Sequence, residues 1–220
     1  MIRITLDGAA IGEPDAPDLP PVSVDTAEEN PSFLAVAGDR APLYASLVAG
    51  GRMQVERGSV TTDGGNDAQA VRDAVALVDT PVVAEPTADL PVSVIVAEEL
   101  AFADRPHGKS DVAEVLEELG LRRFLAVPLA TVPPTDRTRM LAELAVLRPG
   151  VQALVLTSPE RHGGPTEGWL AVARDFAARG YTVLVIAGHA AVDTARRVAD
   201  TLPPLLSPRS APENTERSAS

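Results

Sequence analysis

The chain has 220 residues and a formal net charge of −12, because 31 aspartates and glutamates outnumber 19 lysines and arginines. A surface this acidic repels phosphate backbones, which argues against nucleic-acid binding through a basic face. The absence of cysteine excludes disulfide scaffolds, thiolate metal sites and cysteine nucleophiles, and the 45% hydrophobic fraction predicts a folded globular chain. No apolar run approaches the roughly 20 residues of a membrane span, and residues 1–5 do not begin an apolar signal-peptide core, so we expect neither.

The first half of the chain has mostly strand patterns. Proline and aspartate are frequent between residues 12 and 21, so we expect an exposed loop there. Residues 43–48 are expected to form a helix that ends at Gly50 and Gly51. Alternating or continuous apolar residues predict strands over residues 2–6, 22–24, 32–37, 58–64 and 75–78.

The second half begins with residues 92–119, whose pattern favours helices. Helical spacing of apolar residues then predicts helices over residues 135–147, 167–178 and 190–202. Short apolar runs predict buried strands over residues 153–156 and 181–187. Buried strands that alternate with helices indicate a mainly parallel sheet with helices on its faces.

This order of elements predicts an α/β core with a mixed β region and an inserted helical subdomain. We assign one domain to residues 1–202 and place the helical subdomain at about residues 92–140. Residues 203–220 are polar, broken by prolines and without periodicity, so we predict a disordered tail there.

Seven landmarks in this order resemble the nucleotide-binding subunit of ABC transporters. Residues 33–38 look like the strand that enters a phosphate loop, and residues 179–189 look like the strand that ends at the family's switch histidine. The other resemblances lie at residues 47–52 with 57–64, 75–79, 94–100, 112–121 with 128–139, and 153–159. The resemblance implies a P-loop NTPase-like core of the ABC ATPase type.

The phosphate loop of that family is poorly matched. Such a loop needs several glycine amides, a lysine on the phosphates and a Ser or Thr on Mg²⁺. Here Gly38 is followed by Asp39 and Arg40, and the only lysine in the chain is Lys109. Pro42 removes one further amide donor.

The catalytic motifs are also missing. Thr157 and Ser158 stand where the Walker B carboxylates belong, so the general base is absent. Glu160 comes two residues late and is expected to be a solvated loop residue. Residues 78–81 contain no Gln, and residues 132–137 replace the signature glycines with prolines and an acid.

The resemblance therefore implies a vestigial nucleotide site without catalytic residues. Either no cofactor or weak ATP binding is expected. His189 is interpreted as an offset switch histidine, or else as a helix-entry residue with no special role. Because the three histidines share no short ligand spacing, no metal site is predicted. The vestigial positions are Gly38, Asp39, Arg40, Ser46, Thr157, Ser158 and His189.

We expect a protein similar to an ABC-transporter ATP-binding subunit, inactive as an ATPase, that serves as a binding or regulatory subunit of a transporter complex. The expected partners are a membrane permease or a second ATPase subunit, in a homodimer or a heterodimer. The expected location is the cytoplasm, at the inner face of the membrane if a partner holds the chain there. Two alternatives stay open: a Rossmann-like enzyme with a site near Ser158 and His189, and an interaction scaffold with no nucleotide-binding ancestry.

Overall fold

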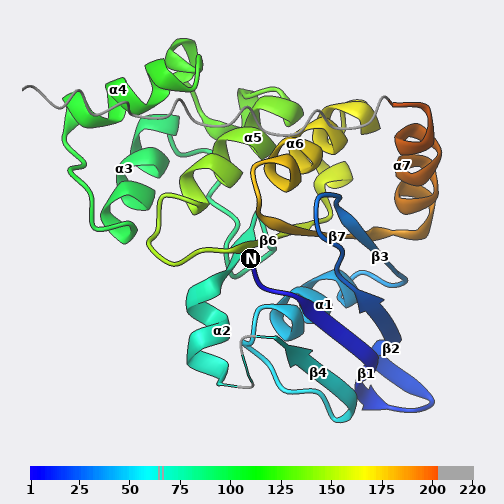
Figure 1. Cartoon of the computed structure of the whole chain (residues 1–220). Coiled ribbons are helices and arrows are strands. Elements are labelled where there is room, and N and C mark those ends of the chain that lie inside the picture. Colours follow the sequence, from blue (N-terminus) through cyan, green and yellow to red (C-terminus); the bar gives the residue numbers. More distant parts are fainter. Residues whose placement is uncertain (64, 66, 203–220) are drawn as a thin grey trace, which may run out of the picture.

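The computed structural model describes residues 1–63, 65 and 67–202, so the predicted tail at 203–220 lies outside the described residues. The strands are β1 (Ile4–Glu13), β2 (Ala16–Asp25), β3 (Ser32–Val36), β4 (Arg57–Thr62), β5 (Val75–Val78), β6 (Ala153–Thr157) and β7 (Thr182–Gly188). They form an antiparallel sheet with the order β2-β1-β4 and a parallel sheet with the order β3-β7-β6-β5 (Figure 1). The mixed β region beside a parallel sheet agrees with the prediction.

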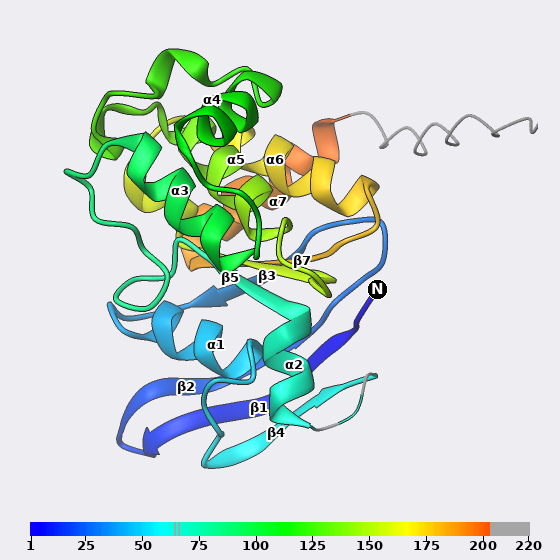
Figure 2. The same cartoon turned by 90° about the vertical axis from the view of Figure 1, so that its left-hand side faces the viewer.

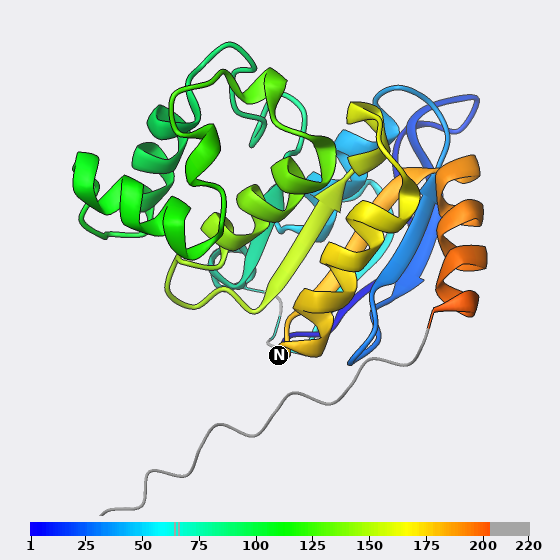
Figure 3. The same ribbon diagram turned by 90° about the horizontal axis from the view of Figure 1, so that it is seen from above.

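The helices separate into two sets. The first set is α1 (Ala41–Ala49) and α2 (Ala68–Ala74), and the second is α3 (Val92–Phe102), α4 (Lys109–Glu118), α5 (Pro134–Ala145), α6 (Thr166–Ala178) and α7 (His189–Thr201). Helix α1 contacts both sheets and forms a layer between them, and α5, α6 and α7 cover the opposite face of the parallel sheet (Figures 2 and 3). Helices α3 and α4 pack together beside α5.

The expected loop at residues 12–21 is wrong. β1 continues to Glu13 and β2 begins at Ala16, so these residues form a hairpin. β2 can contain Pro17, Pro20 and Pro21 because it lies at the edge of its sheet, where a missing N–H does not interrupt a second ladder.

Helix α2 was not predicted from the sequence. It is short, and its N-cap is Asp67, whose Oδ1 accepts a hydrogen bond of 2.9 Å from the Gln69 N–H. The prediction of a helical subdomain at about residues 92–140 covers α3, α4 and the start of α5. Because α5 also contacts β5, the boundary of that subdomain stays a prediction.

The parallel strands are buried on both faces, and their side chains alternate between two cores. On β6, Leu154 and Leu156 pack with α3 to α7, whereas Val155 points to the side of α1 and the antiparallel sheet. β7 repeats the pattern with Val185 on the first side and Ile186 on the second. Each fully buried Leu or Ile stabilises the fold by about 1.5–3 kcal/mol, so this sheet anchors the loops at its ends.

Candidate functional site

The carboxyl ends of the parallel strands form one edge of the sheet. Since β3, β7, β6 and β5 are neighbours in that order, the residues that follow Val36, Gly188, Thr157 and Val78 all emerge at this edge. In open α/β sheets this is the edge where ligands bind. The vestigial positions predicted from the sequence follow these ends or lie on α1 beside them.

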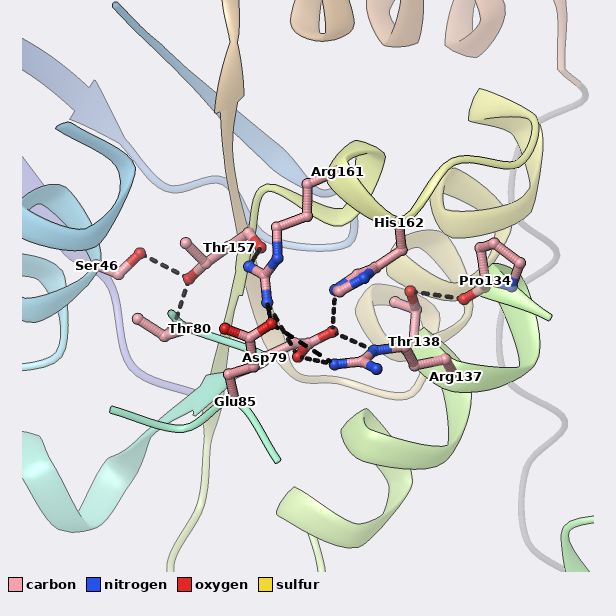
Figure 4. A network of polar contacts seen from close by, with 10 residues as sticks. All are labelled: Ser46, Asp79, Thr80, Glu85, Pro134, Arg137, Thr138, Thr157, Arg161 and His162. Carbon is pink, nitrogen blue, oxygen red and sulfur yellow. Dashed lines mark hydrogen bonds and ion pairs between the residues drawn. The ribbon is translucent and has the colours of Figure 1, made fainter. Parts of the chain in front are cut away.

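A chain of three hydroxyl groups crosses the centre of this edge (Figure 4). Thr157 Oγ1 lies 2.7 Å from Ser46 Oγ on α1 and 2.7 Å from Thr80 Oγ1 in the turn after β5. Ser46 Oγ donates to the Pro42 carbonyl at 2.8 Å. Because each hydroxyl has one proton, Thr157 must donate to Ser46, and Thr80 must then donate to Thr157.

This hydroxyl chain is closed to solvent. Ser46 and Thr80 are fully buried and Thr157 is 1% exposed. Every hydroxyl proton in it is used internally, so none is left for a substrate. A neutral hydroxyl at this point neither binds Mg²⁺ as a carboxylate does nor accepts a proton from water. The structure therefore brings Ser46 and Thr157 together, with Thr80 as a third member that the sequence did not single out.

The connection between β3 and α1 is short. Four residues, 37–40, join the strand to the helix. Gly38 takes a left-handed conformation with φ +97°, and Asp39 and Arg40 are exposed. Arg40 precedes the first turn of α1 without a side-chain cap, and Pro42 stands inside that turn. Few backbone amides are left to surround a phosphate here.

Ser158 and His189 are the other two predicted positions. Ser158 has left-handed backbone angles (φ 45°, ψ 55°), and its N–H donates to the Ile186 carbonyl at 2.7 Å. His189 is the exposed first residue of α7. Within the described residues, no hydrogen bond links the two side chains, so the structure does not assemble them into one catalytic unit.

Glu160 corrects one expectation. It is not a solvated loop residue, because its Oε1 accepts a hydrogen bond of 3.1 Å from the Gly188 N–H. Its Oε2 is buried and has no hydrogen-bond partner in the described part of the chain. Since Gly188 precedes α7 without a side-chain cap of its own, Glu160 supplies an acceptor at the start of this helix from another element.

A buried ion cluster lies beside the hydroxyl chain (Figure 4). Arg137 on α5 donates to both carboxylate oxygens of Asp79, from Nε at 2.8 Å and from Nη2 at 2.7 Å. Arg161 Nη2 lies 3.2 Å from Asp79 and 2.9 Å from Glu85. His162 Nε2 lies 2.8 Å from Asp79 Oδ2, a contact that is an ion pair when the imidazole is protonated.

The environment of Asp79 keeps its carboxylate ionised. Burial alone would raise the pKa of Asp79, but the hydrogen bonds from Arg137, the contact with His162 and their charges outweigh it. Together they hold the pKa of Asp79 well below its usual value. The Asp79 and Arg137 side chains are 9% and 5% exposed, so this is a buried, paired charge.

Asp79, Glu85 and His162 also place three potential ligand atoms within 4.8 Å of one another. The donor set fits a cation poorly, because the guanidinium groups of Arg137 and Arg161 already contact the same carboxylates. We therefore assign no metal to this cluster.

Sequence reasoning did not identify the ion cluster. Asp79 directly follows a buried strand, which is the one local signal. Its partners Arg137 and Arg161 are 58 and 82 residues away in the chain. Only the crossover through α3, α4 and α5 brings them to one edge.

No protein-family model and no curated protein matches the sequence. The fold, in contrast, is similar to solved structures. A nucleotide-free ATP-binding cassette from an ABC transporter has a TM-score of 0.60 at 14% identity, over 86% of this chain and 82% of that chain. A putative ABC transporter ATP-binding protein from Pyrococcus furiosus has a TM-score of 0.60 at 12% identity, over 85% and 92%. A bacterial Atm1-family ABC exporter with ATP bound has a TM-score of 0.55 at 14% identity, over 84% of this chain and 34% of that chain.

At these identities the similarity establishes the fold. The prediction of a P-loop NTPase-like α/β core of the ABC ATPase type is confirmed, and the alternative of an unrelated Rossmann-like architecture is disfavoured by the antiparallel sheet below α1 and by α3 and α4 beside α5. The chain has the fold of an ABC transporter ATP-binding cassette.

Proposed function

We propose that this chain is a catalytically inactive member of the ABC-ATPase-like proteins, a pseudo-ATPase that acts by binding as a regulatory subunit of a transporter complex. The single observation that carries this proposal is the buried hydroxyl chain of Ser46, Thr157 and Thr80. It occupies the place where a hydrolytic site needs carboxylates for Mg²⁺ and water.

The surroundings of the hydroxyl chain support weak or no ATP binding. The four-residue connection before α1 offers few amides, and Asp39 adds negative charge where a triphosphate would lie. The only lysine, Lys109, begins α4, in a different part of the fold from α1. Arg40 is the one basic residue of that connection.

Calorimetry with ATP–Mg²⁺ and a phosphate-release assay test the loss of catalysis. We expect no saturable binding below about 1 mM ATP and no release above the buffer blank. If weak binding appears, R40Q should reduce it whereas R105Q, at an exposed site after α3, should not. Micromolar binding together with phosphate release that S158A abolishes would contradict the proposal.

The surface for a partner is proposed at the turn after β5 and the end of α3. Val82, Val83 and Phe102 are 90%, 50% and 75% exposed, which is unusual for large apolar side chains. Val82 also has a left-handed backbone, φ 68°, which is strained for a β-branched residue. Val83 and Phe102 line a cavity of about 210 Å³.

Glu99 is one of three charged residues that line this cavity, together with Asp79 and Arg148. Burial raises the pKa of Glu99, with Glu98 adding to the effect and Arg148 opposing it. Within the described residues Glu99 makes no ion pair. An apolar rim around an unpaired carboxylate fits a partner segment with apolar side chains and one Lys or Arg.

We propose a membrane permease as this partner, with a second ATPase subunit or another copy of the chain in a dimer as the alternatives. The likeness to an ABC exporter supports the permease. None of the helices in the described ranges is long and apolar enough to cross a membrane. The location proposed with this partner is the cytoplasm, at the inner face of the membrane, where the permease would hold the chain.

Photocrosslinking in membranes of the source cells tests the partner. A photoreactive residue replaces Phe102, and a control replaces exposed Asp193 on α7. We expect a crosslink to a multi-span membrane protein from position 102 and none from position 193. Crosslinks to a second ATPase subunit or to another copy of the chain would support the alternatives. Equal crosslinking from both positions would contradict a docking surface at Phe102.

A further inference from the structure

A groove lies between the end of α1, β4 and α2. These three elements are in the lower half of Figure 2. Its volume is about 400 Å³, which is in the range of small-molecule sites, roughly 300–1,000 Å³. Two arginines, Arg52 and Arg72, line it together with apolar side chains. The apolar lining includes Val48, Met53, Val55, Val60 and Val71.

The two arginines have only neutral hydrogen-bond partners. Arg52 Nη1 donates to the Gly50 carbonyl at 2.7 Å and to the Val75 carbonyl at 3.3 Å. Arg72 Nη1 donates to the Gly51 carbonyl at 3.2 Å, and its Nη2 donates to Gln69 at 2.7 Å. Neither forms an ion pair with a carboxylate in the part of the chain that the structure describes.

The groove therefore concentrates positive charge in a chain whose net charge is −12. Burial lowers the pKa of Arg52, and repulsion from Arg148 and Arg72 lowers it further, with partial compensation from Asp73. Asp73 is itself engaged, because its Oδ1 accepts a hydrogen bond from Gln69 at 2.8 Å.

Capping of α1 explains part of this arrangement. Arginines near a helix C-terminus are stabilising because they bind its last carbonyls. These contacts involve Nη1 of each arginine, whereas a guanidinium has five N–H donors in a planar fork. The remaining donors suit an oxyanion with several acceptor oxygens.

The groove is separate from the vestigial nucleotide site. Arg52 binds the carbonyl of Val75, the first residue of β5, whereas Thr80 of the hydroxyl chain follows the last residue of the same strand. The two sites therefore lie at opposite ends of β5, and a ligand in one does not contact the other.

We propose that this arginine groove binds a phosphate monoester with a small apolar substituent, its phosphate between Arg52 and Arg72 and its substituent against the valines. Two unpaired guanidinium charges match a dianion better than a single carboxylate. The apolar walls favour an ester over inorganic phosphate. This inference is independent of the proposed function, since it uses none of the residues of the hydroxyl chain or of the Phe102 surface.

Calorimetry on the full chain with phenyl phosphate tests the proposal. We expect saturable binding with a Kd on the order of 0.1 mM, weakened when salt rises from 50 to 300 mM. Inorganic phosphate and phenol should each bind at least about tenfold more weakly, because each lacks half of the ligand. R72Q should weaken phenyl phosphate binding by about tenfold or more.

R105Q is the matched control, because it removes an exposed arginine after α3 that lines neither the groove nor the vestigial nucleotide site. It should leave phenyl phosphate binding unchanged. Arg52 also binds carbonyls at the end of α1, so the R52Q variant is informative only if its thermal unfolding curve is native-like. If R52Q is destabilised, the R72Q variant alone tests the proposal. No saturable binding by folded protein, an equal loss in R105Q, or tighter binding of succinate than of phenyl phosphate would overturn the proposal.

Discussion

Arg137 binds both carboxylate oxygens of Asp79, at 2.7 and 2.8 Å, although 58 residues separate them in the chain. This bidentate pair fixes the start of α5 to the turn after β5. The short helical turn after β6 (Pro159–His162) contacts the same carboxylate through Arg161 and His162. Three connections that meet at the carboxyl edge of the sheet are thereby held by one buried side chain.

Asp79 is expected to be a major contributor to stability. D79N leaves Arg137 buried without its counter-charge, so it should lower the free energy of unfolding by about 3–5 kcal/mol. D136N is the control, because it breaks an Arg–Asp pair of similar length, 2.8 Å, in which Arg123 is 59% exposed. That change should cost about 0–1 kcal/mol. Urea denaturation measures both, and equal costs would contradict the assigned role of burial.

The Asp79 contribution is also expected to depend on pH. The folded state lowers the pKa of Asp79 below its ordinary value of 3.8, so the stabilisation is complete above that pH. It is lost as pH falls through the lower pKa of the folded state. The stability difference between the native chain and D79N should therefore be constant from pH 7 to 5 and shrink below pH 3.8. A difference that grows on acidification would show that Asp79 is not the paired group.

Because the hydrogen bonds of the hydroxyl chain run in one direction, its members are expected to contribute unequally to the free energy of unfolding. T157V removes the acceptor of Thr80 and leaves a buried donor unpaired, which should cost about 1–3 kcal/mol. T80V should cost less, because Thr157 keeps its own acceptor, Ser46. T157S retains the hydroxyl and serves as the control. Chemical denaturation of the three variants checks the order, and a larger cost for T80V than for T157V would reverse the assigned direction.

Glu99 should lower the stability of the isolated chain at neutral pH. Its pKa is raised in the folded state, so its stabilising effect exists below the ordinary value of 4.5 and is lost as pH rises through the folded pKa. E99Q should therefore raise the Tm at pH 7 and have a smaller effect near pH 4. E114Q, at an exposed position of α4, is the control, because Glu98 itself contributes to the raised pKa of Glu99. If Glu99 serves a partner, E99Q should stabilise the chain and weaken the crosslink at position 102 together.

Gly58 is predicted to tolerate no side chain. Its φ is +75°, and a Cβ there would lie 2.3 Å from backbone atoms of Gly8 in β1. G58A should therefore cost more than about 2 kcal/mol, from strain and from the forced separation of β1 and β4. G38A is the matched control, because Gly38 also has a positive φ, +97°, but nothing within 4 Å of the added atom. Thermal unfolding compares the two variants. Similar losses of stability in G58A and G38A would mean that the positive φ alone, and not the close approach of β1, causes the destabilisation.

The sequence predicted the parallel sheet better than the antiparallel one. β6 and β7 are continuous apolar runs that are buried on both faces, so their ranges were predicted closely. The expected range 153–156 ends one residue before β6 does, and the expected range 181–187 begins and ends one residue before β7. β2 was predicted only over residues 22–24, because its three prolines favour a turn in the part before them. α2 was not predicted, because a helix of seven residues with Val71 as its one large apolar side chain is too short to show a periodicity.

The site was predictable only in part. Ser46 and Thr157 were named from the family resemblance, and the structure joins them by a hydrogen bond. That the seven vestigial positions bind a nucleotide weakly or not at all stays a prediction. The Asp79–Arg137 pair was beyond sequence reasoning, because an Asp after a strand and an Arg in a helix are common and only the tertiary fold joins them.

The prolines of β2 also limit how copies of the chain can associate. β2 forms one margin of the antiparallel sheet, and Pro17, Pro20 and Pro21 interrupt its row of N–H donors. A second molecule cannot extend the sheet there by regular strand addition, so this margin is protected from the edge-to-edge polymerisation that exposed strands invite.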